Sequence, residues 1–177
     1  MTKHAATMVV TSIFSMLLST SAVAGNGKFS AGYNRVSNDE VSLGAIVTRY
    51  NRKIIAYRNI NFGAEAELSY GVIGDETAFL SQEIEVNAEF GMGLFSTISY
   101  PLTDKGSSIF LRLGYAQQET GNRIGDTIVT DEAKGFAYGL GGNWMMTKRQ
   151  GVRADALKIQ GDDDEVDLYG LSYVFQH

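Results

Sequence analysis

The chain has 177 residues, of which 44% are hydrophobic and 11% aromatic, and it carries 20 acidic against 15 basic side chains. The net charge of −5 argues against a nucleic-acid-binding protein, because contacts with phosphates need a basic surface. Cysteine is absent, which excludes disulfides and cysteine-ligated metal centres. The 20 glycines favour strands over helices, since glycine costs about 1 kcal/mol at a helical position.

Residues 1–24 are typical of a cleaved secretory signal peptide. Lys3 and His4 precede an apolar run that ends at Leu18, and Ala22-Val23-Ala24 matches a small-residue cleavage site. At 1.5 Å per residue the apolar run reaches about 21 Å, short of the roughly 30 Å hydrocarbon core of a bilayer. We therefore expect export to the periplasm and a mature chain of residues 25–177, in which His177 is the only histidine.

Apolar and polar residues alternate along much of the mature chain. Between Phe62 and Val72 every even-numbered residue is apolar or aromatic and every odd-numbered one is Gly, Glu or Ser, the pattern of a strand with one apolar face. The run from Ile84 to Leu94 repeats it. Eight strands joined by turns predict an all-β fold, an eight-stranded antiparallel up-and-down transmembrane β-barrel. The six further strands are expected at Lys28–Val36, Val41–Tyr50, Ile109–Gln117, Gly135–Trp144, Gly151–Ile159 and Glu165–Phe175.

Three features indicate that the apolar faces point outward into lipid. Glycines recur on the polar faces, and small residues suit the crowded interior of an eight-stranded barrel. Aromatic residues gather toward both ends of the strands, as in the interfacial girdles of outer-membrane barrels. The connections Thr103–Gly106 and Met146–Gln150 at one end are short, whereas Gly74–Gln82 and Gln118–Lys134 at the other are expected to be longer external loops.

Charged residues within the strands are then expected to lie in the lumen. An Arg or Lys facing the bilayer midplane costs about 2 to 4 kcal/mol, and the whole set would cost on the order of 10 kcal/mol, comparable to the stability of a domain. Because a buried ion without a partner is unfavourable, the glutamates should pair with the arginines and plug the lumen. The predicted lumen charges are Glu65, Glu67, Glu85, Glu89, Arg112, Arg153 and Asp155.

Two segments allow more than one interpretation. In the second strand, Ile46, Val47 and Arg49 break the alternation, so its facing is left open. The connection at residues 51–61 is long for a periplasmic turn and contains both basic and apolar residues. It either extends the two neighbouring strands or forms a basic amphipathic segment that touches the inner leaflet.

The final strand resembles the C-terminal signature of Gram-negative outer-membrane proteins, which is similar to the pattern read by the barrel-assembly machinery. The residues that carry this resemblance are Tyr169, Gly170, Leu171, Tyr173 and Phe175. The segments Tyr100–Lys105, Leu111–Tyr115 and Gly135–Gly141 look like a turn and two strands of the small outer-membrane β-barrel family of the OmpA and OmpX type. The resemblance covers Lys28 to Phe175 and implies a place in the outer membrane, surrounded by lipid and lipopolysaccharide. We expect a monomer, since a closed barrel leaves no free strand edge and can stand alone. Gln176 and His177 depart from it, because the family usually ends on the aromatic residue.

Some members of that family modify lipid A, which raises the question of whether this chain carries catalytic groups. A serine hydrolase needs a histidine base, and only His177 remains after export. The acidic run at residues 162–165 lacks the spacing of a calcium loop and is expected to be a solvated hairpin tip. A weaker alternative is that its acids share divalent cations with lipopolysaccharide phosphates. We predict no catalytic residues, no cofactor and no metal.

The expected function is a non-enzymatic structural or surface-interaction role through the external loops, with host or cell-surface molecules as possible ligands. The segment Gln118–Lys134 is the best candidate contact surface, because it is long and polar. Its candidate contact residues are Arg123, Asp126, Asp131 and Glu132. One alternative is a narrow cation-preferring channel lined by glutamates. Another is a soluble periplasmic barrel whose apolar faces point inward around a small apolar ligand.

Overall fold

The computed structural model describes residues 27–38, 41–73, 75–79, 82–124, 127–161 and 165–176. The predicted signal peptide, residues 1–24, lies outside these ranges. Within them, no helix is long and apolar enough to cross a membrane. The described chain forms strands β1 Gly27–Asn38, β2 Val41–Tyr57, β3 Ile60–Ile73, β4 Asp75–Phe79, β5 Gln82–Pro101, β6 Ser108–Ile124, β7 Thr127–Met145, β8 Gln150–Gly161 and β9 Glu165–Gln176.

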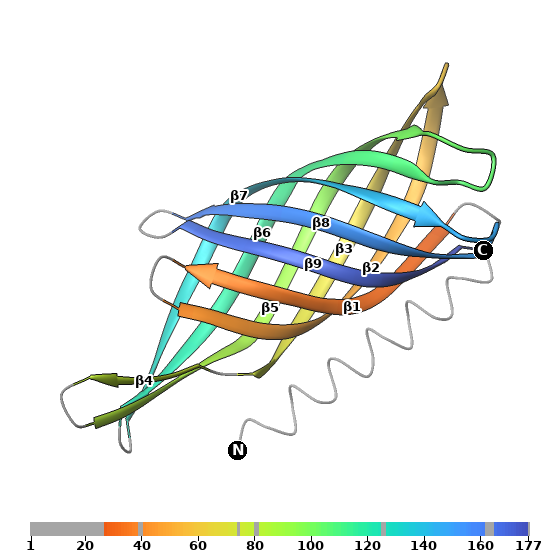
Figure 1. Ribbon diagram of the computed structural model, residues 1–177. Helices are drawn as coiled ribbons and strands as arrows, with labels where there is room; N and C mark the ends of the chain where they lie inside the picture. The colour runs from red at the N-terminus through yellow and green to blue at the C-terminus, as the bar shows by residue number, and fades with distance from the viewer. Residues whose placement is uncertain are drawn as a thin grey trace, which may run out of the picture.

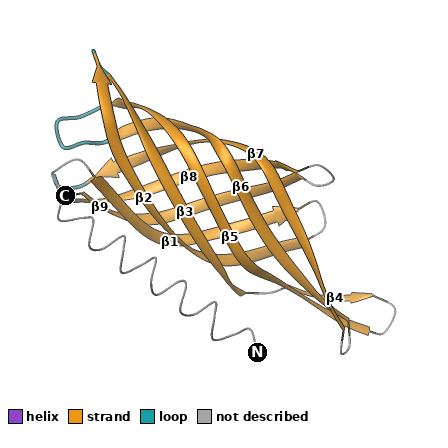
Figure 2. Ribbon diagram, turned by 180° about the vertical axis from the view of Figure 1, so that it is seen from behind, coloured by secondary structure: helices purple, strands orange, loops and turns teal. Residues whose placement is uncertain are grey.

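Eight of these strands close into an antiparallel barrel (Figures 1 and 2). Neighbours in sequence pair with one another, β1 pairs with β9, and the pairing of β3 with β5 completes the ring. The short strand β4 lies outside the ring and pairs with the first residues of β5. The predicted eight-stranded up-and-down barrel is therefore confirmed, with β4 as an element that the sequence pattern did not reveal.

The two ends of the barrel differ. One end, called the turn end below, holds the connections β2–β3, β5–β6 and β7–β8 together with Gly27 and Gln176. The connection β5–β6 is closed by the amide of Leu102 donating to the carbonyl of Ser107 at 2.7 Å, and Gly106 supplies the left-handed backbone (φ 97°) that this turn requires. The other end, called the hairpin end, is where β1 meets β2, β6 meets β7 and β8 meets β9.

The prediction of two long external loops at the hairpin end is wrong, because both segments contain paired strands. The ladder between β6 and β7 continues from Ser108↔Asn143 to Ile124↔Thr127, so strand pairing extends through most of the segment predicted as a loop. Residues 74–82 likewise contain β4. The physical reason lies in the β-branched residues on both sides of Gly125-Asp126, a residue pair that short hairpin turns favour. Residues 125–126 themselves lie outside the described ranges.

The segment at residues 51–61 extends both neighbouring strands, which is the first of the two interpretations given above. Pairing of β2 with β3 reaches Tyr57↔Ile60, which leaves only Arg58 and Asn59 in the turn. Arg58 has a left-handed backbone (φ 52°), which is unusual for a residue other than glycine. A register shift between Lys53 and Ile55 then keeps Ile55, Tyr57 and Phe62 on the outer face of the sheet.

The outward faces carry a broad apolar surface. Trp144 is 72% exposed and Leu94 is 71% exposed, although both are large hydrophobic residues in regular strands. The soluble-carrier alternative required the apolar faces to point inward, which this arrangement contradicts. Other large side chains of this surface are Tyr33, Ile46, Tyr70, Met92, Ile98, Tyr100, Ile109, Leu111, Leu113, Tyr115, Phe136, Leu140, Tyr169, Leu171 and Tyr173.

The interior is layered along the barrel axis. Toward the hairpin end it is a cluster of buried apolar side chains. Charged side chains fill the middle, and a polar cavity occupies the turn end. The apolar layer consists of Val36, Leu43, Ala45, Phe95, Ala116, Ala133, Ala137, Leu157, Ile159, Val166 and Leu168.

Candidate functional site

Six charged side chains meet in the middle of the lumen, and we call them the lumen network. They project inward from four strands, β2, β3, β6 and β8, and are between 0 and 8% exposed. Every member has at least one ion pair with another member. The lumen network consists of Arg49, Glu65, Glu67, Arg112, Arg153 and Asp155.

Arg153 contacts two carboxylates and an aromatic ring. Its two terminal nitrogens donate to the two carboxylate oxygens of Glu65 at 2.6 and 2.9 Å, and its Nε donates to Asp155 at 3.0 Å. The guanidinium also lies over the ring of Phe110, 4.3 Å from the ring centroid. A planar guanidinium suits this site because it pairs with a carboxylate through two hydrogen bonds while stacking on an aromatic face.

Arg112 connects all three carboxylates. One terminal nitrogen donates to Glu65 at 3.1 Å and to Glu67, and the other donates to Asp155. Its guanidinium lies 4.9 Å from the ring centroid of Phe95. Because Glu65 and Asp155 also contact Arg153, the two arginines hold the same acids from two sides.

Arg49 is the member that the sequence analysis missed. Its Nε donates to Glu67 at 2.6 Å, and its terminal nitrogens donate to Ser172 and to Asn34, each at 2.9 Å. A terminal nitrogen also lies 3.4 Å from Asp155. The signal was present, because a charged residue in the middle of a membrane-type strand is costly on the lipid face. Ile46 and Val47 hid it by placing apolar residues on both faces of β2.

Glycines on the two neighbouring strands leave room around Asp155 for the side chains of the network. Asp155 lies opposite Gly141 on β7 and Gly170 on β9. A Cβ atom at Gly170 would lie 2.5 Å from Oδ1 of Asn34 and 3.1 Å from a terminal nitrogen of Arg49. Gly170, which the sequence analysis placed in the C-terminal assembly signature, therefore also makes room for the network.

The charges of the lumen network balance, because three arginines face three carboxylates. Exposed ion pairs contribute little to stability, whereas removing one partner of a buried pair leaves an uncompensated charge. Within the described ranges, no group of three or more potential metal-ligating side chains could hold a metal ion. The arrangement therefore links strands on opposite sides of the barrel and fills the middle of the lumen.

Other predicted site residues lie elsewhere. Glu85 and Glu89 belong to β5, and Arg123 and Asp131 to β6 and β7, but their side chains are outside the part that the structure describes. Asp126 is outside it entirely. The C-terminal signature residues lie in β9, where Leu171 and Tyr173 face outward.

Glu132 is exposed at the hairpin end. One of its carboxylate oxygens lies 3.7 Å from the ammonium of Lys134, in a pair whose side chains are 42% and 53% exposed. Glu165, from the acidic run predicted at the β8–β9 tip, pairs with Lys158 at 2.5 Å, and residues 162–164 lie outside the described ranges.

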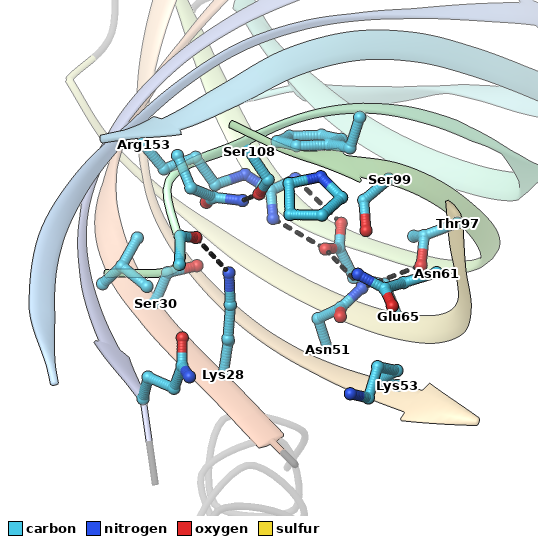
Figure 3. A pocket seen from close by; sticks show the side chains of 16 residues that line it. Lys28, Ser30, Asn51, Lys53, Asn61, Glu65, Thr97, Ser99, Ser108 and Arg153 are labelled. Carbon is cyan, nitrogen blue, oxygen red and sulfur yellow. Dashed lines mark hydrogen bonds and ion pairs between the residues drawn. The ribbon is translucent and has the colours of Figure 1, made fainter. Parts of the chain in front are cut away.

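A polar cavity of about 220 Å³ lies between the lumen network and the turn end (Figure 3). Arg153 and Glu65 line its inner side. Lys28 lines its wall and donates to the carbonyl of Gly106 at 3.1 Å, and Lys53 lines it from the neighbouring strand. The remaining polar side chains of the lining are Ser30, Asn51, Asn61, Thr97, Ser99, Ser108, Asn143 and Gln176.

No protein-family model matches the sequence, and no curated protein matches it significantly. Among solved structures, the chain is similar to Ail, the attachment invasion locus protein of Yersinia pestis, with a TM-score of 0.62 and 13% identity over 88% of this chain and 100% of Ail. A structure of Ail in complex with the heparin analogue sucrose octasulfate gives the same TM-score at 15% identity, over 88% of this chain and 100% of Ail.

Two proteins of Pseudomonas aeruginosa have similar structures. The N-terminal β-barrel domain of OprF has a TM-score of 0.57 and 15% identity, over 87% of this chain and 100% of that domain. The outer membrane protein OprG has a TM-score of 0.59 and 10% identity, over 87% of this chain and 97% of OprG. At these identities the likeness establishes the fold: this chain has the eight-stranded transmembrane β-barrel fold of small Gram-negative outer-membrane proteins.

Proposed function

We propose that this protein is a non-enzymatic outer-membrane barrel that makes surface contacts through its hairpin end. The apolar outer surface supports insertion into a bilayer, because a soluble protein rarely exposes so large an apolar area. The closed ladder supports it too, since every backbone group within a hydrocarbon core needs a hydrogen-bond partner. The position of Gln176 at the turn end, together with the overhang of β6 and β7 at the hairpin end, supports a periplasmic position for the turn end.

The observation that carries the surface role is a sheet that extends beyond the barrel at the hairpin end. Pairing of β7 with β8 stops at Gly135, so residues 127–134 of β7 continue past the end of β8. At roughly 3.3 Å per residue, this overhang is about 26 Å long. The whole extension, which we call the protruding sheet, consists of β4 with residues 82–89 of β5, 119–124 of β6 and 127–134 of β7. Figure 1 shows its strands reaching beyond the barrel beside β4.

The charge of the protruding sheet favours a basic partner. Its strands carry eight acidic residues against Arg123 and Lys134. A sulfated polyanion such as the analogue bound by Ail would be repelled by this balance, whereas a basic protein surface would be attracted. The acids are Asp75, Glu76, Glu83, Glu85, Glu89, Glu119, Asp131 and Glu132.

Deleting the overhang of the β6–β7 hairpin tests this function. Residues 120–131 are replaced by Asn-Gly, and the protein is expressed in a Gram-negative host that does not otherwise adhere. The variant should keep the heat-dependent shift in gel mobility that marks a folded barrel. Binding of the bacteria to cultured animal cells should fall to the level measured for the expression strain without the protein. Unchanged binding by the folded variant would overturn the proposal.

The sign of the charge is tested by a matched pair of substitutions two residues apart. Glu132→Lys makes the protruding sheet less acidic, and Lys134→Glu makes it more acidic, while both sites are exposed and partly screened. If the partner is basic, Glu132→Lys should weaken binding and Lys134→Glu should strengthen it. Equal effects of the two substitutions would contradict recognition by charge.

A further inference from the structure

We propose that the cavity at the turn end is a binding site for a small oxyanion, a phosphate, sulfate or carboxylate group, held by Lys28 and Lys53. Nothing in the surface role proposed above requires such a site, and the inference does not depend on that role. It rests on the charges of the cavity lining, on the hydrogen-bond donors that remain available there, and on the basic rim around the cavity.

The inner side of the cavity contributes no net charge. Glu65 is the only carboxylate among the lining residues, and both of its oxygens accept hydrogen bonds from Arg153. All three nitrogen positions of the Arg153 guanidinium donate within the lumen network. The cavity charge therefore comes from the two lysines.

Lys28 and Lys53 are close together on one face of the sheet. Lys28 pairs with Asn51 across the β1–β2 ladder, and Lys53 lies two residues farther along the inward face of β2. Diagonal neighbours of this kind have Cα atoms about 7–8 Å apart. Among the described residues, neither ammonium has a carboxylate within ion-pair distance. Two like charges without a counter-charge are unfavourable, and an anion between them would remove the repulsion.

The lining can also donate hydrogen bonds to an anion. The ammonium of Lys28 uses one of its three protons on the carbonyl of Gly106. The hydroxyl oxygens of Thr97 and Ser108 accept from Asn51 at 3.0 Å and Asn143 at 3.2 Å, so their own protons can point into the cavity. Figure 3 shows Lys28, Thr97 and Ser108 around the same space.

The surroundings of the cavity attract anions. Within the described chain, seven basic residues lie at the turn end against the single acid Asp104. A concave site surrounded by charges of one sign raises the local concentration of ions of the opposite sign. The cavity volume of about 220 Å³ suits a single phosphate group with a few waters or a short attached chain. The basic residues are Lys28, Arg52, Lys53, Arg58, Lys105, Lys148 and Arg149.

The test measures stabilisation of the folded barrel by anions, because a ligand that binds only the folded state raises the unfolding midpoint. The full protein in dodecyl maltoside is unfolded in urea at increasing phosphate, with sodium chloride adjusted to hold ionic strength constant. We expect a saturable rise with phosphate and with sulfate. The double substitution Lys28→Gln/Lys53→Gln should weaken the apparent affinity at least tenfold. Lys134→Gln/Lys158→Gln removes the same charge from exposed pairs toward the hairpin end, away from the cavity and its rim, and should leave the affinity within twofold.

Lys53→Gln alone is measured as well, because this exposed side chain can be replaced without disturbing the bond from Lys28 to Gly106. The single variant should lose at least threefold in affinity, so the test survives a double variant that does not fold. Absence of a saturable rise in the wild type, or an equal rise in the cavity and control variants, would overturn the proposal. Adding phosphatidylglycerol to the micelles identifies the source: competition with phosphate assigns a lipid headgroup, and its absence assigns a soluble ligand.

Discussion

Arg153 and Glu65 form a two-point ion pair across the lumen, from β8 to β3, with nitrogen–oxygen distances of 2.6 and 2.9 Å. They are 88 residues apart in the chain and not on neighbouring strands. Their side chains are 4% and 1% exposed, so the pair is shielded from water and salt. The lumen network therefore braces the barrel wall internally, in addition to the hydrogen bonds between strands.

Glu65→Gln should destabilise the barrel strongly. The substitution removes the charge that Arg153 and Arg112 share, and both guanidinium groups are buried. Loss of one partner from a buried ion pair costs about 3 to 5 kcal/mol. The free energy of unfolding in urea, followed by the fluorescence of Trp144 in detergent, should fall by this amount.

Lys134→Gln is the control for that experiment. It breaks the pair with Glu132, whose nitrogen–oxygen distance is 3.7 Å and whose side chains are largely exposed. Such pairs contribute at most about 1 kcal/mol, and many contribute nothing measurable. Similar losses for Glu65→Gln and Lys134→Gln would contradict the bracing role of the lumen network.

Gly170→Ala should destabilise the folded protein by about 1 to 3 kcal/mol, because the added methyl group displaces Asn34 and Arg49. Gly142→Ala is the matched control, since its Cβ would meet nothing nearer than the carbonyl oxygen of Ser108 at 3.7 Å. Both variants are refolded from urea in detergent, without assembly machinery, and their unfolding midpoints are compared. If Gly170 served only as part of an assembly signal, its variant would be as stable as Gly142→Ala.

The extended β2–β3 hairpin should lie against the membrane. Its exposed residues Ile55 and Tyr57 share the outer face with Phe62, and Arg58 stacks on Tyr57 at 5.5 Å. Aromatic and basic residues together are typical of the membrane–water interface. In a Trp144→Phe background, Tyr57→Trp should be quenched by lipids brominated near the headgroup.

Two further tryptophan positions calibrate that measurement. Leu140→Trp reports the apolar outer surface, since Leu140 is 62% exposed and Tyr57 is 63% exposed. Lys148→Trp reports the water-exposed β7–β8 turn. Quenching of Trp at position 57 only to the level of position 148 would place the hairpin in water. Strong quenching at position 140 would still establish insertion of the barrel.

Purified wild-type protein should give no discrete conductance steps in planar bilayers. Arg112 is 0% exposed and is packed among three carboxylates, and the apolar layer lies between it and the hairpin end. A general porin in the same chamber serves as the positive control. Reproducible cation-selective steps would contradict a plugged lumen and support the channel alternative.

Much of the fold could be predicted because the direction in which each side chain of a strand points, outward or inward, follows from the local alternation of residues. Alternation is clear in residues 62–72 of β3 and 84–94 of β5, where every even-numbered residue is apolar or aromatic. It failed in β2, where Val47 is fully buried in the lumen and Ile46 is 52% exposed on the outer face. The lumen is apolar near the hairpin end, so both faces of that strand carry apolar residues and Arg49 could not be assigned from pattern alone.

The ends of the strands were harder to predict than their centres. Outside a hydrocarbon layer, polar residues are tolerated on both faces of a hairpin, so alternation disappears while the backbone ladder continues. For this reason the residues between Gln118 and Lys134 have the sequence pattern of a loop, although most of them are paired in the β6–β7 ladder. Backbone hydrogen bonds extend the β6–β7 ladder through this segment, and such bonds cannot be recognised from the side-chain pattern.

The sequence by itself determined the architecture and the inward position of most strand charges, because a period of two and the cost of a charge in lipid act on each strand separately. Only the tertiary structure decided which charges meet. Besides Asp155 on its own strand, Arg153 reaches Glu65 because closure and register of the whole barrel bring β8 and β3 to the same level. The cavity with Lys28 and Lys53 likewise exists only where strands far apart in the chain enclose it.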